Sequence, residues 1–267
     1  MTIQVFLPTI SLVGVPTEYA FAKISRAGFD GVEVLATSKI RGKADSFRQL
    51  ANKHHLGLHW HQPWNYTENT NHWYNWVANQ LGMLESRNYK LKDILPESQT
   101  EPIVVYADRW NEAREMPLVW LQTCAVMNSE GRHSLSFNGF MRLVHEHRPR
   151  VVFDTQHFLE WYFGSYGISG LPTDIKQLEV ALLKGWSELG PYVSEIHFND
   201  FDPRRGNSWG RNLVLGRGIA PLKSFARAVR QSGWQGVVTP EISPFHLFPY
   251  RLKTMKYLRD YVAELFL

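Results

Sequence analysis

The sequence has 267 residues, of which 44% are hydrophobic and 20% are charged, and its formal net charge is +4. This is an ordinary globular composition that can bury a full core, and it excludes a fibrous or low-complexity chain. The Lys and Arg residues are scattered along the chain, so the small positive charge permits nucleic-acid binding without indicating it. The length suits one large α/β domain or two small ones.

Cysteine content and hydropathy indicate which cellular compartment to expect. Cys124 is the only cysteine, so one chain can form neither a disulfide nor a cysteine-based metal site, and a reducing compartment is expected. Residues 1–7 lack the basic region and long apolar run of a signal peptide. No stretch approaches the roughly 18 apolar residues that cross a membrane. We therefore expect a cytoplasmic protein without a membrane span.

The first half of the chain reads as short apolar strands that alternate with helices. Strands are predicted at 4–7, 31–35, 56–61 and 103–106. Helices are predicted at 16–26, at 45–55 with Asp45 as its cap, and at 71–84. Residues 85–101 are polar and include Pro96, so irregular structure is expected there.

The second half continues the same alternation. A short helix at 108–115 leads to a strand at 118–122, a helix at 135–147 and a strand at 151–154. An excursion rich in aromatic residues and glycine follows, with the run Trp161 to Gly167. The remaining elements are a helix at 174–189, a strand at 193–197, a helix at 221–231, a strand at 236–239 and a helix at 252–265.

Eight strands alternating with helices predict a TIM barrel. We expect a single (β/α)8 barrel domain over residues 1–267, with a shortened fourth β/α unit. A doubly wound open sheet is the structural alternative. It is disfavoured because no glycine-rich turn follows the first strand, where a nucleotide-binding fingerprint would lie.

Polar side chains end most of the predicted strands. Asp154 follows three apolar residues and His157 comes three positions later, although an Asp that caps the next turn beside a surface His would look the same. The other strand ends carry Glu33, His59, His61, Tyr106, Gln122, His197 and Glu241. Because the carboxyl ends of barrel strands meet at one mouth, these groups should become neighbours. Carboxylates and imidazoles in such a group suit Mn²⁺, Mg²⁺, Co²⁺ or Zn²⁺.

Six motifs carry a resemblance over nearly the whole chain: FDGVE at 29–33, HQP at 61–63, FDTQH at 153–157, IHFND at 196–200, LGRGIAPL at 215–222 and GWQGVVTPE at 233–241. In this order the sequence resembles the xylose-isomerase-like (β/α)8 superfamily. That superfamily includes sugar isomerases and epimerases, inosose dehydratases and endonuclease IV. Each motif alone is weak, and their order and strand positions carry the resemblance.

The resemblance implies a metal site and catalytic residues. It implies that a divalent metal is held after strands five to eight, at Gln122, Asp154, His197 and Glu241. It also implies that Glu241 and His157 take part in catalysis. Gln122 departs from the family's Glu: it cannot act as a base, although its carbonyl oxygen can bind a metal, which makes the metal itself uncertain. Glu130, in the same loop, could supply the missing carboxylate.

The departure at Gln122 bears on the reaction. Epimerases use two carboxylates on opposite faces of the substrate, whereas here Glu241 is the obvious carboxylate base. A one-base isomerisation or a dehydratase-type elimination is compatible with this set, with His157, His61 or Glu130 as partner. The predicted function is that of a sugar isomerase/epimerase-like enzyme that acts on a small sugar or polyol carbonyl compound by metal-assisted proton transfer.

Four further residues are predicted to bind substrate: His61, Glu33, Trp64 and Arg204. Glu33 could instead pair with a basic neighbour, and Arg204 could be plain surface charge. Residues 161–166 could form a pocket wall or a contact between subunits, so a homo-oligomer stays open.

Two other functions remain open. An endonuclease IV-like abasic-site nuclease is disfavoured because residues 209–213 lack that branch's Asp-x-His motif and Tyr106 replaces its strand-four His. Nucleic acid is therefore not the expected partner. The other alternative is a barrel that has lost catalysis and only binds a ligand.

Overall fold

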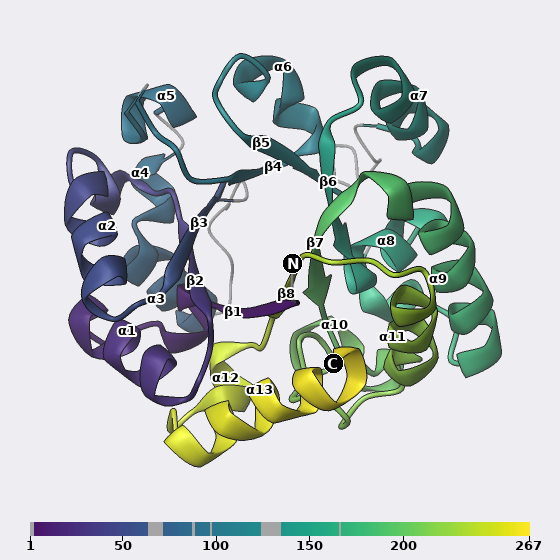
Figure 1. Ribbon diagram of the computed structural model, residues 1–267. Helices are drawn as coiled ribbons and strands as arrows, with labels where there is room; N and C mark the ends of the chain where they lie inside the picture. Colours follow the sequence, from purple (N-terminus) through teal and green to yellow (C-terminus); the bar gives the residue numbers. More distant parts are fainter. Residues whose placement is uncertain (1–2, 64–71, 87–88, 97, 124–134, 166) are drawn as a thin grey trace.

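Eight parallel strands close into a barrel in the computed structural model, which describes residues 3–63, 72–86, 89–96, 98–123, 135–165 and 167–267 (Figure 1). The strands are β1 (Gln4–Pro8), β2 (Gly31–Leu35), β3 (Gly57–His61), β4 (Ile103–Tyr106), β5 (Val119–Gln122), β6 (Arg150–Asp154), β7 (Val193–Phe198) and β8 (Val237–Pro240). Each strand pairs with the next along the chain, and β8 pairs with β1. The predicted (β/α)8 fold is confirmed.

The helices surround the strands (Figure 1). They are α1 (Thr17–Arg26), α2 (Ala44–Lys53), α3 (His72–Leu81), α4 (Met83–Ser86), α5 (Leu91–Ile94), α6 (Trp110–Ala113), α7 (Phe137–His147), α8 (Thr155–Tyr162), α9 (Ile175–Leu189), α10 (Gly206–Trp209), α11 (Leu222–Gln231), α12 (Pro244–Leu247) and α13 (Leu252–Phe266). The four residues of α6 account for the predicted shortening of the fourth β/α unit.

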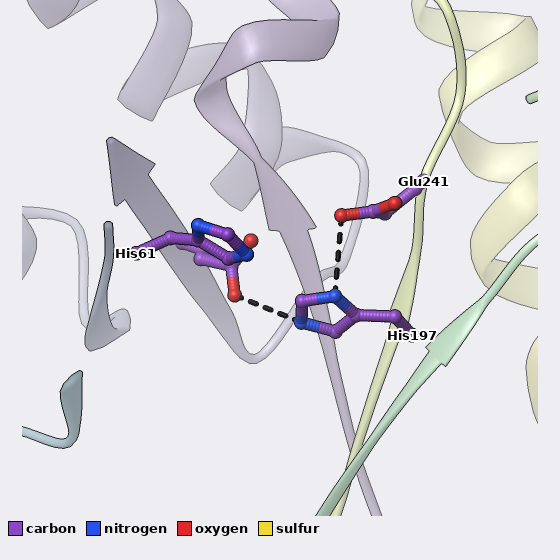
Figure 2. A group of neighbouring side chains, drawn as sticks. His61, His197 and Glu241 are labelled. Atoms are coloured by element: carbon purple, nitrogen blue, oxygen red, sulfur yellow. Dashed lines mark hydrogen bonds and ion pairs between the residues drawn. The ribbon is translucent and has the colours of Figure 1, made fainter. Parts of the chain in front are cut away.

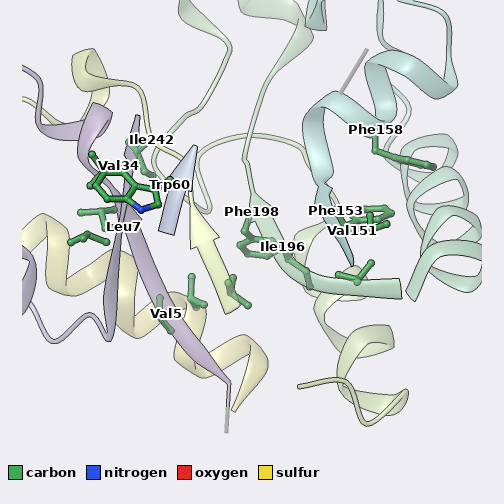
Figure 3. Close-up of a cluster of buried hydrophobic side chains, with 14 of the residues drawn as sticks. Val5, Leu7, Val34, Trp60, Val151, Phe153, Phe158, Ile196, Phe198 and Ile242 are labelled. Atoms are coloured by element: carbon green, nitrogen blue, oxygen red, sulfur yellow. The ribbon is translucent and has the colours of Figure 1, made fainter. Parts of the chain in front are cut away.

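Alternation along β6 separates the core from the site. Phe153 faces outward, and its ring stacks on Phe158 of α8 and Phe225 of α11 at centroid distances of 4.9 and 5.3 Å (Figure 3). Val152, one position earlier, joins a separate buried cluster with side chains of β4 and β5. Because successive strand residues face opposite sides, Asp154 shares the inner side with Val152.

The same alternation operates on β7. Ile196 and Phe198 belong to the apolar layer between strands and helices (Figure 3). Glu195 and His197 occupy the alternate positions, so both carry fully buried polar side chains inside the barrel. The register places Asp154 of β6 directly beside His197 of β7. Packing of the outer layer thereby fixes which polar residues meet at the mouth.

Three predictions of local structure were wrong in the first half of the chain. The helix expected at 71–84 is divided into α3 and α4 at Gly82, whose φ of 71° is left-handed. The stretch 85–101, expected to be irregular, contains α5. Asp45 lies inside the first turn of α2 and does not cap it, because that helix begins one residue earlier, at Ala44.

The aromatic run after β6 also differs from the prediction. Helix α8 begins directly after Asp154 and continues to Tyr162, so Trp161 is helical. The Trp161 ring packs edge-on against Phe140 of α7 at 4.9 Å and is 4% exposed. Trp161 therefore joins two outer helices and is neither a pocket wall nor a surface contact.

In the described part of the chain, no helix combines the length and the apolar character needed to span a membrane.

Candidate functional site

His197 is the centre of a buried polar group at the carboxyl ends of the strands. Its Nδ1 lies 3.2 Å from Glu241 Oε1 and 3.8 Å from Asp154 Oδ2. Gln122 Nε2 is 3.3 Å from the same Nδ1 atom. Figure 2 shows the His197 ring beside Glu241 and His61. The four residues predicted to hold a metal, from strands five to eight, are therefore brought together around one imidazole nitrogen.

Asp154 serves two neighbours with its two carboxylate oxygens. Oδ1 accepts the backbone N–H groups of Gln156 and His157 at 2.9 and 2.8 Å, which caps the start of α8. Oδ2 accepts from Gln122 Nε2 at 3.1 Å and faces His197. The side chain is fully buried. Asp154 is thus both a helix cap and a member of the central group.

His61 and Gln122 form a buried hydrogen-bonded pair. His61 Nδ1 is 2.6 Å from the backbone carbonyl oxygen of Gln62, which can only accept, so Nδ1 carries a proton. His61 Nε2 is 2.9 Å from Gln122 Oε1. This contact requires a second proton on His61, or else an exchange of the Gln122 amide atoms. The exchanged amide donates to a neutral His61 and turns its carbonyl oxygen toward Asp154.

Two carboxylates lie on the other side of the His197 ring. Glu33 Oε2 is 3.0 Å from His197 Nε2, and Glu195 Oε1 is 3.7 Å from the same nitrogen. Glu195 also pairs with His59 Nδ1 at 2.9 Å and accepts a hydrogen bond from Thr239. Glu33, predicted to contact substrate, therefore binds Nε2 of His197, the ring nitrogen that faces away from Glu241 and Asp154.

Glu195 is a site residue that strand-end reasoning missed. It lies two positions before His197, and strand residues with this spacing share a face. Applied to the strand that ends at His197, this period of two would have placed Glu195 inside the barrel. His59 and His61 of β3 share a face by the same period. The sequence signal for Glu195 was therefore a carboxylate two positions before His197.

The charges of the group favour a cation at its centre. Burial opposes charging of His197, but Glu33 and Glu241 outweigh it and raise the His197 pKa well above its usual value. Burial likewise opposes ionisation of Glu241, yet His197 lowers its pKa to about 2. Burial raises the pKa of Asp154. These carboxylates therefore favour a positive charge between them, and either a proton or a metal ion can supply it.

The donors present fit a divalent metal. One ligand atom from each of Glu33, His61, His197 and Glu241 lies within 4.8 Å of the others. Asp154 and Gln122 border the same space through their contacts with His197. Carboxylate oxygens and imidazole nitrogens are the ligands of Zn²⁺, Co²⁺ and Mn²⁺. The group could therefore hold such an ion.

His157 belongs to a second charged cluster on α8. Its Nδ1 is 2.8 Å from Glu160 Oε2, and Glu160 also accepts from Arg211 at 3.1 Å. Burial opposes charging of His157, but Asp154 and Glu160 outweigh it and raise its pKa to about 9. His157 is accordingly a cation at neutral pH. Predicted as catalytic, it lies next to the central group through its backbone bond to Asp154.

The raised His157 pKa predicts a pH dependence of stability. A histidine whose pKa is higher in the folded state than in the unfolded chain stabilises fully below the unfolded value, about 6.5. That contribution is at most about 3 kcal/mol and is lost as the pH rises through about 9. Urea unfolding of wild type and His157→Gln should differ most near pH 6 and converge by pH 10. His145→Gln, at an exposed position on α7, is the control. A difference that does not change with pH would contradict the assignment.

Of the other predicted residues, Arg204 does not join the central group. Arg204 is paired with Asp202, with Nε 2.7 Å from Oδ1, and its side chain is 62% exposed. Trp64 and Glu130 lie outside the described residues. Their roles in binding substrate or metal stay predictions.

A family model described as xylose isomerase-like TIM barrel matches residues 95–261. No curated protein matched the sequence. Solved structures with the same fold include a D-psicose 3-epimerase with D-tagatose from Clostridium cellulolyticum H10, with a TM-score of 0.56 and 14% identity over 98% of this chain and 99% of that one.

Two other solved structures share the fold. A probable 3-DHS dehydratase, AsbF of Bacillus anthracis, has a TM-score of 0.58 and 14% identity, over 97% of this chain and 98% of that one. An IolI protein with a bound zinc atom has a TM-score of 0.61 and 12% identity, over 98% of each chain. At these identities the likeness is one of fold.

Proposed function

Since this chain belongs to the xylose isomerase-like TIM-barrel family, we propose that it is a metal-dependent enzyme of the sugar isomerase/epimerase type. Its substrate is a small sugar or polyol carbonyl compound. The reaction begins with removal of a proton from the carbon next to the carbonyl group. The observation that carries this proposal is the convergence of Asp154 and Glu241 on His197 Nδ1, at the mouth of the barrel.

The residues that would hold the metal are Asp154, His197 and Glu241, with the carbonyl oxygen of Gln122 as a fourth donor, while Glu33 and His61 contact His197 and Gln122. A divalent ion in this place supplies electrostatic stabilisation of negative charge that develops on a substrate oxygen. Glu33 supports the arrangement, because a proton held on His197 Nε2 by Glu33 leaves Nδ1 as the free donor atom. The zinc atom bound by the IolI protein is a parallel among structures of the same fold.

Glu241 is the base that removes the substrate proton. Its side chain is 19% exposed, whereas His197 and Asp154 are fully buried, so Glu241 is the carboxylate that a substrate in the mouth can reach. A divalent ion held here would replace the proton on His197 Nδ1 as the positive charge that faces Glu241.

His157 is the positively charged partner of Glu241. Its Nδ1 is engaged by Glu160, which leaves Nε2–H to donate to a substrate oxygen. Gln122 cannot accept a proton as a base, so a symmetrical two-base epimerisation is disfavoured. Isomerisation and dehydratase-type elimination remain, and both begin with the same proton abstraction. The probable dehydratase of the same fold is a parallel for the elimination.

Deuterium incorporation tests the proposal without knowledge of the product. The protein is stripped with a chelator, loaded separately with Mn²⁺, Mg²⁺, Co²⁺ or Zn²⁺, and incubated in D₂O with aldoses, 2-ketoses and cyclic polyol ketones. We expect metal-dependent deuterium at the carbon next to the carbonyl, detected by NMR. A ligand that raises the melting temperature of the metal-loaded protein without any deuterium exchange would contradict catalysis and favour a binding barrel.

A further inference from the structure

Asn199 joins two carboxylates of the central group. It follows β7 and is two residues beyond His197, and its side chain is fully buried. The amide nitrogen Nδ2 lies 3.2 Å from Asp154 Oδ1 and 3.2 Å from Glu241 Oε2. One amide group therefore donates to both carboxylates from a single point. Neither sequence motifs nor strand ends assigned it a role.

These bonds divide the carboxylate oxygens into two sets. Asp154 Oδ1, which also receives two backbone N–H groups of α8, is fully engaged, while Oδ2 faces His197 Nδ1. Glu241 Oε2 receives Asn199 and, at 3.5 Å, Asn212, while Oε1 faces His197 Nδ1. In each carboxylate, the oxygen bound by Asn199 is the one turned away from the centre.

The direction of the Asn199 amide is itself fixed. Its carbonyl oxygen accepts from Asn212 Nδ2 at 2.6 Å, and its backbone N–H donates to Thr155 Oγ1 at 2.9 Å. Since an amide oxygen cannot donate, the nitrogen must face the carboxylates. Asn212 has a φ of 44°, a left-handed conformation that asparagine tolerates, and its backbone carbonyl accepts from Ser243. Asn199 is thus held by Asn212, by Thr155 and by the two carboxylates.

We propose that Asn199 is a positioning residue that selects which oxygens of Asp154 and Glu241 bind the metal. The inference rests on the proposed metal centre and adds to it the group that orients two of its ligands. Two carboxylates that converge on one point repel each other, and each can rotate its second oxygen inward. The Asn199 amide holds one oxygen of each carboxylate by a hydrogen bond, which prevents this rotation. Loss of such an outer partner typically weakens metal binding 10–100-fold.

Metal binding by Asn199→Leu tests the proposal, because leucine has a similar shape and no donor. The affinity for Co²⁺ is measured by competition with a chelator, and the visible absorption spectrum of bound Co²⁺ reports its coordination. We expect affinity about 10–100-fold weaker than in wild type and a changed spectrum. Asn79→Leu, at an exposed position on α3, is the matched control and should retain both properties.

A second variant covers the case in which the buried substitution prevents folding. Asn212→Gly keeps the left-handed backbone and removes the amide that orients Asn199, together with its weaker 3.5 Å contact with Glu241 Oε2. We expect a smaller loss of affinity with the same direction of spectral change. Wild-type affinity and spectrum in the folded variants would overturn the role of Asn199 while the metal centre stands. Absence of Co²⁺ binding in wild type would overturn both.

Discussion

Replacing Glu241 with Gln lowers turnover by about 10²–10⁴-fold, which is the contribution of a general base. The variant keeps the shape of the side chain and an amide oxygen that can accept from Asn199 and Asn212, whose bonds reach Glu241 Oε2. It loses the charge and the ability to take a proton. Turnover is measured as deuterium exchange or product formation with the metal-loaded protein, and folding is followed by circular dichroism.

A surface substitution of the same kind separates catalysis from a general loss of charge. Glu264, exposed on α13, is changed to Gln as the control and should retain wild-type turnover. Metal content is determined for each protein, because Glu241 is also a proposed ligand. Near wild-type turnover of a metal-loaded Glu241→Gln protein would remove Glu241 from the role of base.

Two substitutions of Asp154 separate its roles as metal ligand and helix cap. Asp154→Asn keeps an oxygen that can accept from the N–H groups of Gln156 and His157, so α8 remains capped. It loses the charge that faces His197, and metal affinity falls by more than about 10²-fold, beyond the loss of an outer partner. Asp154→Ala should lose the same affinity and, in addition, about 1 kcal/mol of stability from the cap.

The comparison requires metal titration and unfolding of the metal-free protein. In the metal-free state, Asp154→Ala should unfold at lower urea concentration than Asp154→Asn, because only the latter caps the helix. Equal metal affinity in wild type and Asp154→Asn would show that the carboxylate is not a ligand. Equal stability of the two variants would show that the cap contributes little.

The barrel and the outline of its site could be predicted because both depend on local pattern. A buried parallel strand is a short apolar run, and its carboxyl end meets those of its neighbours. Asp154, His197 and Glu241 were found in this way. The structure adds that Asp154 caps α8 with one oxygen while the other faces His197. The capping interpretation of Asp154 is therefore confirmed, and its role as a metal ligand stays a prediction.

The remainder depends on contacts between distant parts of the chain. The helix α8 was missed because aromatic residues such as Trp161 suit both a rim and a buried helix face, and only its packing on α7 decides. Glu195 was missed because only the last polar residue of each strand was considered, and Glu195 lies two residues before His197. Its partner His59 comes from a strand 136 residues away. No local pattern pairs two such side chains.

Gln122 shows how structure refines a departure noted in the sequence. The sequence indicates only that the family's carboxylate is missing. The structure shows His61 Nε2 at 2.9 Å from Gln122 Oε1, while Gln122 Nε2 contacts Asp154 Oδ2 at 3.1 Å. The amide therefore remains in contact with the ligand group. Which of its atoms faces the centre depends on the proton of His61, a property that residue identity does not reveal.

Anomalous X-ray diffraction from crystals grown with Zn²⁺ or Mn²⁺ tests the central claim most directly. The account predicts an anomalous peak at the mouth of the barrel, about 2.0–2.2 Å from Asp154, His197 Nδ1 and Glu241. It also predicts that Gln122 presents its carbonyl oxygen to the ion. No peak at saturating metal, or an ion bound only elsewhere on the molecule, would contradict the proposed metal centre and the function built on it.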